Sequence, residues 1–182
     1  MKVYYIRHGK SAKVQPPASD LKRSLNEEGQ QQAERRGAKL GSIHFNLVLS
    51  SPAIRAVETA GIIGAGPAVS ALPQLYIPDN EDGKFLDALF ERLGYATLRE
   101  YEENGAAAPL QRSALATIRA IQMCLMMVAR RENILVVGHA ILLNAIGVCL
   151  QGRTGKEALH DFLMKECEGF LDDGEKITLI QD

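Results

Sequence analysis

The sequence lacks the features that mark several common classes of protein. It has no excess of either charge, since 21 basic and 22 acidic side chains give a net charge of −1. This balance argues against a general binder of nucleic acids. Its three cysteines are odd in number and form no CxxC pair, so we expect free thiols in a reducing compartment. Internal repeats and low-complexity tracts are also missing.

No targeting or membrane segment stands out either. The N-terminus runs directly into MKVYYI, without the apolar core and small-residue cleavage site of a signal peptide. The stretch most like a membrane span, residues 134–150, is interrupted by Gly138, His139 and Asn144 and falls short of the roughly 20 residues that a spanning helix needs. We therefore expect a cytoplasmic protein that has no membrane partner.

The chain does have the composition of an ordinary globular protein. A length of 182 residues and a hydrophobic content of 46% suffice for one domain with a sizeable core, which we expect over residues 1–182. Short β-rich runs alternate with longer helical patterns. This order is typical of an α/β protein, and it predicts a three-layer α/β/α sandwich around a mostly parallel sheet.

The pattern also gives the positions of the elements. Strands are predicted at residues 2–6, 46–49, 69–72, 134–137 and 176–180, and helices at residues 24–40, 51–64, 84–103, 110–130, 140–151 and 156–166. Asn26 is suited to cap the first helix, while Ser51 and Pro52 suit the start of the second.

Polar residues follow three of the predicted strands at the point where each strand ends. Arg7 and His8 follow the first strand, Arg55 follows the second, and His139 follows residues 134–137. In open α/β sheets, ligands bind outside the carboxyl ends of the strands. These four side chains are therefore expected to meet in one pocket.

The residue types in this pocket point to a phosphoryl group. Arg7 and Arg55 are permanently charged forks that suit bidentate contact with phosphate oxygens. A neutral histidine is a competent nucleophile, and formation of a phosphohistidine divides phosphoryl transfer into two easier steps. Neighbouring arginine charges lower the pKa of a histidine from about 6.5, which keeps its lone pair available near neutral pH. This scheme needs no metal and no cofactor.

Four motifs occur in an order that carries further information. They are RHGKSA, SLNEEGQQQA, SSPAIRAVETA and VVGHA, and with the strand that precedes the first they extend from residue 4 to residue 140. In order and approximate spacing they resemble the histidine phosphatase superfamily, which has the phosphoglycerate mutase-like fold. Each motif is weak alone, but the set is highly specific. The short chain resembles the branch of bacterial phosphohistidine phosphatases.

The resemblance implies a role for each matching residue. His8 of the RHG motif would be the nucleophile that is phosphorylated, and Arg7 and Arg55 would bind phosphate. His139 would contact phosphate and stabilise the transition state. Ser11 occupies a position that lines the same pocket in many relatives, and is expected to bind phosphate there.

The sequence also departs from the family pattern. Lys10 stands where many relatives have an acidic residue or Gln, and Val14 replaces an asparagine. Most relatives supply a carboxylate as general acid, for which the resemblance offers Glu81 and Asp79 here, with Asp82, Glu100, Glu102 and Glu103 as further candidates. The branch that acts on phosphohistidine often lacks such an acid. Lys22 and Arg23 are expected to form a solvated charged patch.

These observations predict a phosphatase that hydrolyses a phosphomonoester or a protein phosphohistidine through a phosphohistidine on His8. Its partners would be a phosphorylated small molecule or a phosphohistidine-bearing protein, and not nucleic acid. A small-metabolite phosphatase and a phosphoglycerate mutase-like enzyme are alternatives, and a catalytically weak module that binds phosphorylated ligands is an alternative of another class. The sequence carries no information on oligomeric state.

Overall fold

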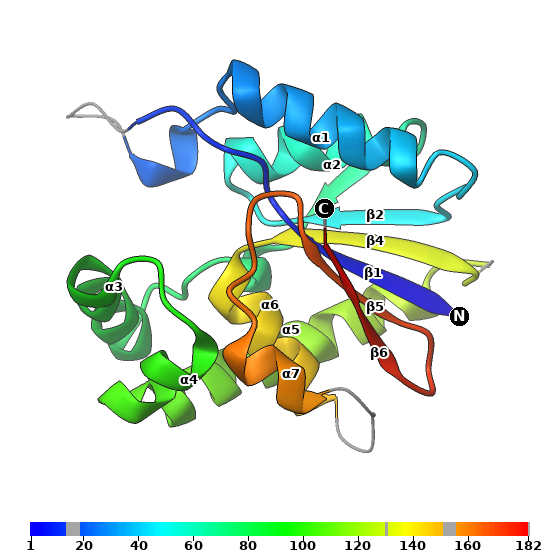
Figure 1. Ribbon diagram of the computed structural model, residues 1–182. Helices are drawn as coiled ribbons and strands as arrows, with labels where there is room; N and C mark the ends of the chain where they lie inside the picture. The colour runs from blue at the N-terminus through cyan, green and yellow to red at the C-terminus, as the bar shows by residue number, and fades with distance from the viewer. Residues whose placement is uncertain (14–18, 130, 151–155, 182) are drawn as a thin grey trace.

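A six-stranded sheet forms the centre of the computed structural model, with helices on both faces (Figure 1). The structure describes residues 1–13, 19–129, 131–150 and 156–181. The strands are β1 (Lys2–Arg7), β2 (Leu47–Ser50), β3 (Val69–Ala71), β4 (Asn133–Gly138), β5 (Gly169–Asp172) and β6 (Ile177–Ile180), in the order β3-β2-β4-β1-β5-β6. The first four are parallel, and β5 and β6 pair antiparallel. The predicted α/β/α sandwich with a mostly parallel sheet is confirmed.

All five predicted strands are present, and their ends differ from the prediction by at most one residue. The prediction missed β5, which pairs with β1. Its four residues are too few for a periodic pattern, and three of them are buried, so polar and apolar positions do not alternate along it.

Seven α-helices are described. They are α1 (Glu27–Lys39), α2 (Ile54–Gly64), α3 (Glu81–Leu93), α4 (Leu98–Tyr101), α5 (Ala107–Met126), α6 (Ala140–Cys149) and α7 (Lys156–Asp161). Figure 1 shows α1 and α2 on one face of the sheet, and α5, α6 and α7 on the other, with α3 and α4 beyond them. Among the described residues, no helix combines the length and apolar composition needed to cross a membrane.

The helix starts confirm one predicted cap and correct another. Asn26 caps α1 by accepting a hydrogen bond from the backbone N–H of Gly29 at 2.8 Å. The prediction that Ser51 caps α2 is wrong, because Ala53 occupies the N-cap position. The hydroxyl of Ser51 contacts a histidine in the candidate site instead.

The region predicted as one helix over residues 84–103 is two helices. Gly94 follows α3 with a φ of 61°, in the left-handed region where glycine carries no steric cost, and the chain then turns before α4. A π-helical turn (Glu102–Ala106) joins α4 to α5.

The last three predicted helices end too late. The structure ends α5 at Met126, α6 at Cys149 and α7 at Asp161, whereas the predicted ends were residues 130, 151 and 166. Residues 130 and 151 themselves lie outside the described residues.

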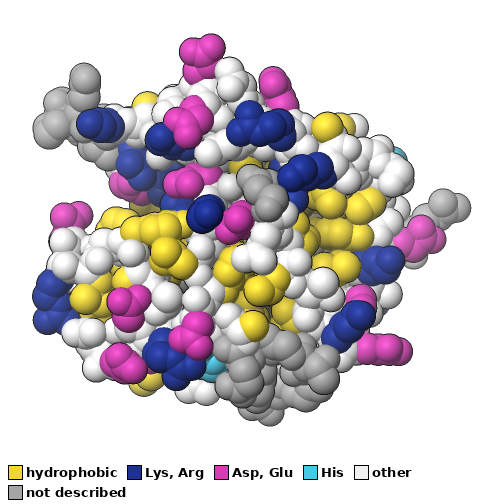
Figure 2. Space-filling model, in the orientation of Figure 1, with side chains coloured by type: hydrophobic (Ala, Val, Ile, Leu, Met, Phe, Trp, Pro, Cys, Tyr) yellow, Lys and Arg dark blue, Asp and Glu magenta, His cyan; other side chains and the backbone are white. Residues whose placement is uncertain are grey.

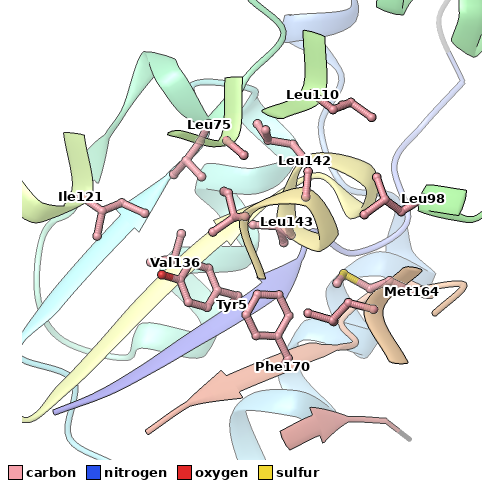
Figure 3. Packing of buried hydrophobic residues seen from close by; sticks show 14 of the residues in the cluster. Tyr5, Leu75, Leu98, Leu110, Ile121, Val136, Leu142, Leu143, Met164 and Phe170 are labelled. Carbon is pink, nitrogen blue, oxygen red and sulfur yellow. The ribbon is translucent and has the colours of Figure 1, made fainter. Parts of the chain in front are cut away.

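Successive residues of the central strands pack on opposite faces of the sheet. Tyr4 and Ile6 face α1 and α2, while Val3 and Tyr5 belong to the larger apolar cluster around α5 and α6. Figure 3 shows part of this larger cluster, in which the Tyr5 and Phe170 rings stack with centroids 4.7 Å apart. Because both faces are covered, the ends of the central strands are fixed and hold polar residues in constant positions.

Candidate active site

Three adjacent strands end at the candidate site. Arg7 is the last residue of β1 and His8 follows it, while His139 follows β4 at the N-cap of α6. Arg55 lies in the first turn of α2, after β2. The rings of His8 and His139 have centroids 5.0 Å apart and an interplanar angle of 68°. The structure therefore brings the two predicted histidines together at the carboxyl edge of the sheet.

The hydrogen bonds of His8 define the protonation of its ring. Its Nδ1 lies 2.7 Å from the carbonyl oxygen of Gly9, and its Nε2 lies 3.2 Å from the Nε of Arg55. A carbonyl oxygen can only accept, and an arginine N–H can only donate. Nδ1 therefore carries the proton, and Nε2 presents its lone pair to the pocket.

Burial and positive charge keep both histidines neutral. Burial lowers the pKa of His8 well below 6.5, and the charges of His139, when protonated, and of Arg55 lower it further. Burial and the charges of Arg55, Arg7 and Arg23 lower the pKa of His139 to about 3. At neutral pH the site thus offers two uncharged imidazoles between permanent cations.

Close backbone packing holds the residues after His8 in place. A Cβ atom on Gly9 would lie 2.6 Å from the carbonyl oxygen of Gly29, and one on Gly29 would lie 2.0 Å from that of Lys10. Only glycine fits at these two positions, because the neighbouring atoms are backbone. The N–H of Gly9 also donates to the hydroxyl of Thr59 at 3.0 Å. The glycines of the first two motifs therefore dock α1 against the end of β1.

Arg7 is held by contacts from the C-terminal segment and from the turn after α3. It donates to the carbonyl oxygen of Met164 at 2.7 Å and forms an ion pair with Glu166 at 3.0 Å. The centre of its guanidinium lies 4.4 Å from the ring centroid of Tyr95, whose hydroxyl contacts both Arg7 and Met164. Tyr95 lies in the turn between α3 and α4, so this turn supplies one wall of the site.

Arg55 is buried and is held by Asp20. The residue is 4% exposed, and it donates to the backbone oxygen of Asp20 at 2.7 Å and to its carboxylate at 2.8 Å. The hydroxyl of Tyr76 donates to the same carboxylate at 2.7 Å, and Arg23 forms an ion pair with it at 2.9 Å. Arg23 is thus half-buried beside the site, and its assignment to a solvated patch is wrong.

His139 is positioned by a serine and a tyrosine. Its Nε2 lies 2.9 Å from the hydroxyl oxygen of Ser51, which also accepts from the N–H of Ala53 at 3.3 Å. The ring of Tyr76 meets that of His139 edge to face, with centroids 5.2 Å apart. These contacts hold the imidazole toward His8.

Two further residues of the first motif lie at the edge of the site. Ser11 is half-buried and forms a β-bridge with Leu25, and its contact with phosphate stays a prediction. Lys10 extends into solvent, where it pairs with Glu28 at 2.6 Å. Val14 lies outside the described residues.

The two predicted acids occupy different places. Glu81 begins α3, its side chain is 89% exposed, and it pairs with Lys84 at 2.7 Å. Asp79 lines an open cleft beside Tyr76. Asp82 forms an ion pair with Arg112 at 2.7 Å. A general acid among these residues stays a prediction.

Sequence reasoning missed four residues that hold the arginines and His139. They are Asp20, Tyr76, Tyr95 and Glu166, and all four contact site residues through folding of distant segments. No motif marks them in the sequence. Within the described part of the chain, no group of three or more His, Cys, Asp and Glu side chains could hold a metal ion.

An open, mostly apolar cleft of about 370 Å³ adjoins the site. Tyr76 belongs to both, because its ring lines the cleft and also contacts His139. Figure 2 shows a hollow between the layer of α1 and α2 and the region of α3, with Lys and Arg side chains along its upper side. The cleft leaves open space beside Tyr76 and His139.

Solved structures share the fold at low sequence identity. Phosphoglycerate mutase from Bacillus anthracis str. Sterne matches with a TM-score of 0.65 and 18% identity, over 100% of this chain and 92% of the other. Phosphoserine phosphatase from Entamoeba histolytica, in complex with 3-phosphoglyceric acid, matches with a TM-score of 0.64 and 18% identity, over 99% and 95%. The protein histidine phosphatase SixA, complexed with tungstate, matches with a TM-score of 0.55 and 20% identity, over 100% and 95%. Among curated proteins no sequence matches.

A neutral buried histidine between two arginines and a second histidine is suited to an enzyme that moves a phosphoryl group through histidine. The family model of the histidine phosphatase superfamily (branch 1) matches residues 3–168 of the chain. The protein belongs to this superfamily, whose members are phosphatases or mutases.

Proposed function

We propose that the protein is a metal-independent phosphatase that hydrolyses a phosphomonoester, or a phosphohistidine in another protein, through a phosphohistidine intermediate on His8. The observation that carries the proposal is the state of His8. Its Nε2 bears no proton and accepts a hydrogen bond from Arg55 at 3.2 Å. A nucleophilic lone pair and a phosphate-binding cation thus lie in direct contact.

The reaction takes two steps at the same atom. In the first, Nε2 of His8 attacks phosphorus, so an N–P bond forms while the bond to the leaving oxygen or nitrogen breaks, and the leaving group takes up a proton from solvent. In the second, water attacks phosphorus and loses a proton to solvent, while the N–P bond breaks and its electron pair returns to Nε2. Arg7, Arg55 and His139 stabilise the charge on the equatorial oxygens in both steps.

The surroundings of His8 favour a phosphohistidine substrate, whose leaving group is a histidine imidazole. Asp20, the carboxylate that contacts Arg55, has a pKa held below its usual value, since the hydrogen bond from Tyr76 and the charges of Arg55 and Arg23 outweigh burial. An ionised carboxylate has no proton to give. A phosphoramidate needs less help from an acid than an ester does, and SixA supplies a structural precedent for a protein histidine phosphatase.

A small-metabolite phosphatase is the second candidate. Tyr95 covers Arg7 from the turn after α3, which narrows the approach to the phosphate site on that side. A narrow approach suits a small ester better than a phosphorylated protein. A substrate panel that compares a phosphohistidine-bearing protein with sugar phosphates, nucleotides and phosphoglycerates distinguishes the two candidates. A mutase would instead transfer phosphate within its substrate and release little of it.

Release of phosphate from an aryl phosphate tests the enzyme itself. We expect the wild type to release phosphate, with or without EDTA, and His8→Ala to lose this activity. The matched control is His44→Ala, because His44 is exposed and lies away from the site. If the wild type released no phosphate, a module that only binds phosphorylated ligands would replace the proposal. Equally fast release by His8→Ala would overturn the assignment of His8 as the nucleophile.

A quenched reaction tests the intermediate. We expect protein-bound phosphate that is labile in acid and stable in base, as a phosphohistidine is, and that is absent from His8→Ala. Label with the opposite stability would place the intermediate on another type of side chain.

A further inference from the structure

The carboxylate of Asp20 is the point at which three donors of the site converge. Arg55 Nη2 donates to its Oδ2 at 2.8 Å, the hydroxyl of Tyr76 donates to the same oxygen at 2.7 Å, and Arg23 Nε lies 2.9 Å from Oδ1. Two cations and a hydroxyl around one anion are also what a phosphate group requires. The protein therefore fills an anion site beside His8 with a carboxylate of its own.

Each nitrogen of the Arg55 guanidinium already donates a hydrogen bond within the protein. Its Nε donates to His8, its Nη1 to the backbone oxygen of Asp20, and its Nη2 to the Asp20 carboxylate. A phosphoryl group binds an arginine in bidentate fashion through two neighbouring nitrogens, either Nε and Nη2 or Nη1 and Nη2. Nη2 of Arg55 takes part in both cases. A bidentate phosphoryl group is therefore brought against the carboxylate of Asp20, and two close anions repel each other.

Asp20 is free to move where Arg55 is not. The side chain of Arg55 is 4% exposed, whereas that of Asp20 is 43% exposed. Asp20 begins a three-residue 3-10 turn (Asp20–Lys22) that contains no buried residue. Displacement of Asp20 thus requires rotation of a surface side chain, while displacement of Arg55 would disrupt the packing of α2.

We propose that the carboxylate of Asp20 competes with phosphate for Arg55, Arg23 and Tyr76. It binds these three side chains until a phosphoryl group arrives at the site, and then gives up the contacts. This makes Asp20 a specificity-determining residue. A monoanion such as a carboxylate gains little by replacing another monoanion, whereas a doubly charged phosphoryl group gains interaction energy with the same donors. The inference rests on phosphate binding by Arg55 and does not require turnover.

Binding of inorganic phosphate, measured by calorimetry, tests the inference. We expect Asp20→Asn to lower the dissociation constant of phosphate by about three- to tenfold, because the competitor is gone while its size is kept. The matched control is Asp87→Asn. Asp87 is largely exposed, and partial desolvation together with the charge of Asp20 raises its pKa. This variant therefore removes a negative charge that is near Asp20 but makes no ion pair with Arg55. We expect it to change the constant by less than about twofold.

An unchanged dissociation constant in Asp20→Asn would overturn the inference, and so would an equal gain in Asp87→Asn. A raised constant would show that Asp20 positions Arg55 for phosphate. A second measurement on the wild type does not depend on the folding of a variant. In a crystal structure with tungstate bound at His8, we expect Oδ2 of Asp20 beyond hydrogen-bond distance of Arg55 Nη2, and a retained contact would contradict displacement. Failure of the phosphatase assay leaves both measurements interpretable.

Discussion

The Nε of Arg55 donates a hydrogen bond to the Nε2 of His8 at 3.2 Å. A guanidinium suited to phosphate therefore also aligns the nucleophile, and it does so by contacting the atom that attacks. Because Nδ1 of His8 donates to Gly9, the lone pair of Nε2 can point only toward this cation and the space beside it.

Replacement of Arg55 by lysine tests whether Arg55 both binds phosphate and aligns His8. Lysine keeps the charge but loses the planar pair of donors that spans His8 and a phosphoryl oxygen. We expect Arg55→Lys to lower kcat/KM on an aryl phosphate by at least about 100-fold. Arg119→Lys, on the exposed face of α5, is the control and should keep wild-type activity. Retention of more than half of the activity in Arg55→Lys would show that charge alone suffices.

The dependence of activity on pH follows from the pKa of His8. Protonation of Nε2 removes the lone pair, and burial together with the charges around it places this protonation well below pH 6.5. The substrate phosphate itself ionises near pH 6, so its titration has to be subtracted from the profile. After this correction, we expect kcat/KM to stay constant as pH falls through 6.5. An enzyme inflection at pH 6.5 would mean that His8 titrates as an exposed imidazole does.

Stability should depend on pH through the same histidines. Below pH 6.5 the unfolded chain binds protons at His139 that the folded state excludes, because the folded-state pKa is about 3. The free energy of unfolding should therefore fall with pH below 6.5, by up to about 1.4 kcal/mol per pH unit for His139. Urea denaturation between pH 7.5 and 5 measures it, and His139→Gln should flatten the slope. His44→Gln, at an exposed histidine outside the site, is the control and should change the slope less.

Packing of α1 against β1 predicts an unusual effect of alanine. In α1, Gly29→Ala gains helix propensity, but its Cβ would lie 2.0 Å from the carbonyl oxygen of Lys10. We expect a net loss of about 1–3 kcal/mol in the free energy of unfolding, since a backbone atom has to shift. Gly61→Ala in α2 is the control, because its Cβ meets no atom within 4 Å. If both variants were stabilised, the two backbones would not be in contact.

The parts of the site that were predictable are those adjacent to strands. Arg7, His8 and His139 each occur at or next to a strand end, and the alternation of β and helical segments predicted the mostly parallel sheet. The start of α2 was placed wrongly because Ser51 has a side chain suited to capping. That hydroxyl contacts His139 instead, and this contact joins residues 88 positions apart in the chain.

The residues that hold the cations could not be predicted. Asp20, Tyr76, Tyr95 and Glu166 lie in short turns and connecting segments that have no periodic pattern, and their partners are distant in the sequence. Charge alone did not distinguish Arg23, which pairs with Asp20, from Lys22, which is exposed.

Local sequence was sufficient to predict the layered α/β fold and the strand ends that carry Arg7, His8 and His139. Periodicity is a local property, so the sequence shows it directly. Folding fixes which nitrogen of His8 carries the proton, how far the pKa values of the histidines fall, and which carboxylate binds Arg55. These depend on burial and on distances between segments, which exist only after the chain has folded.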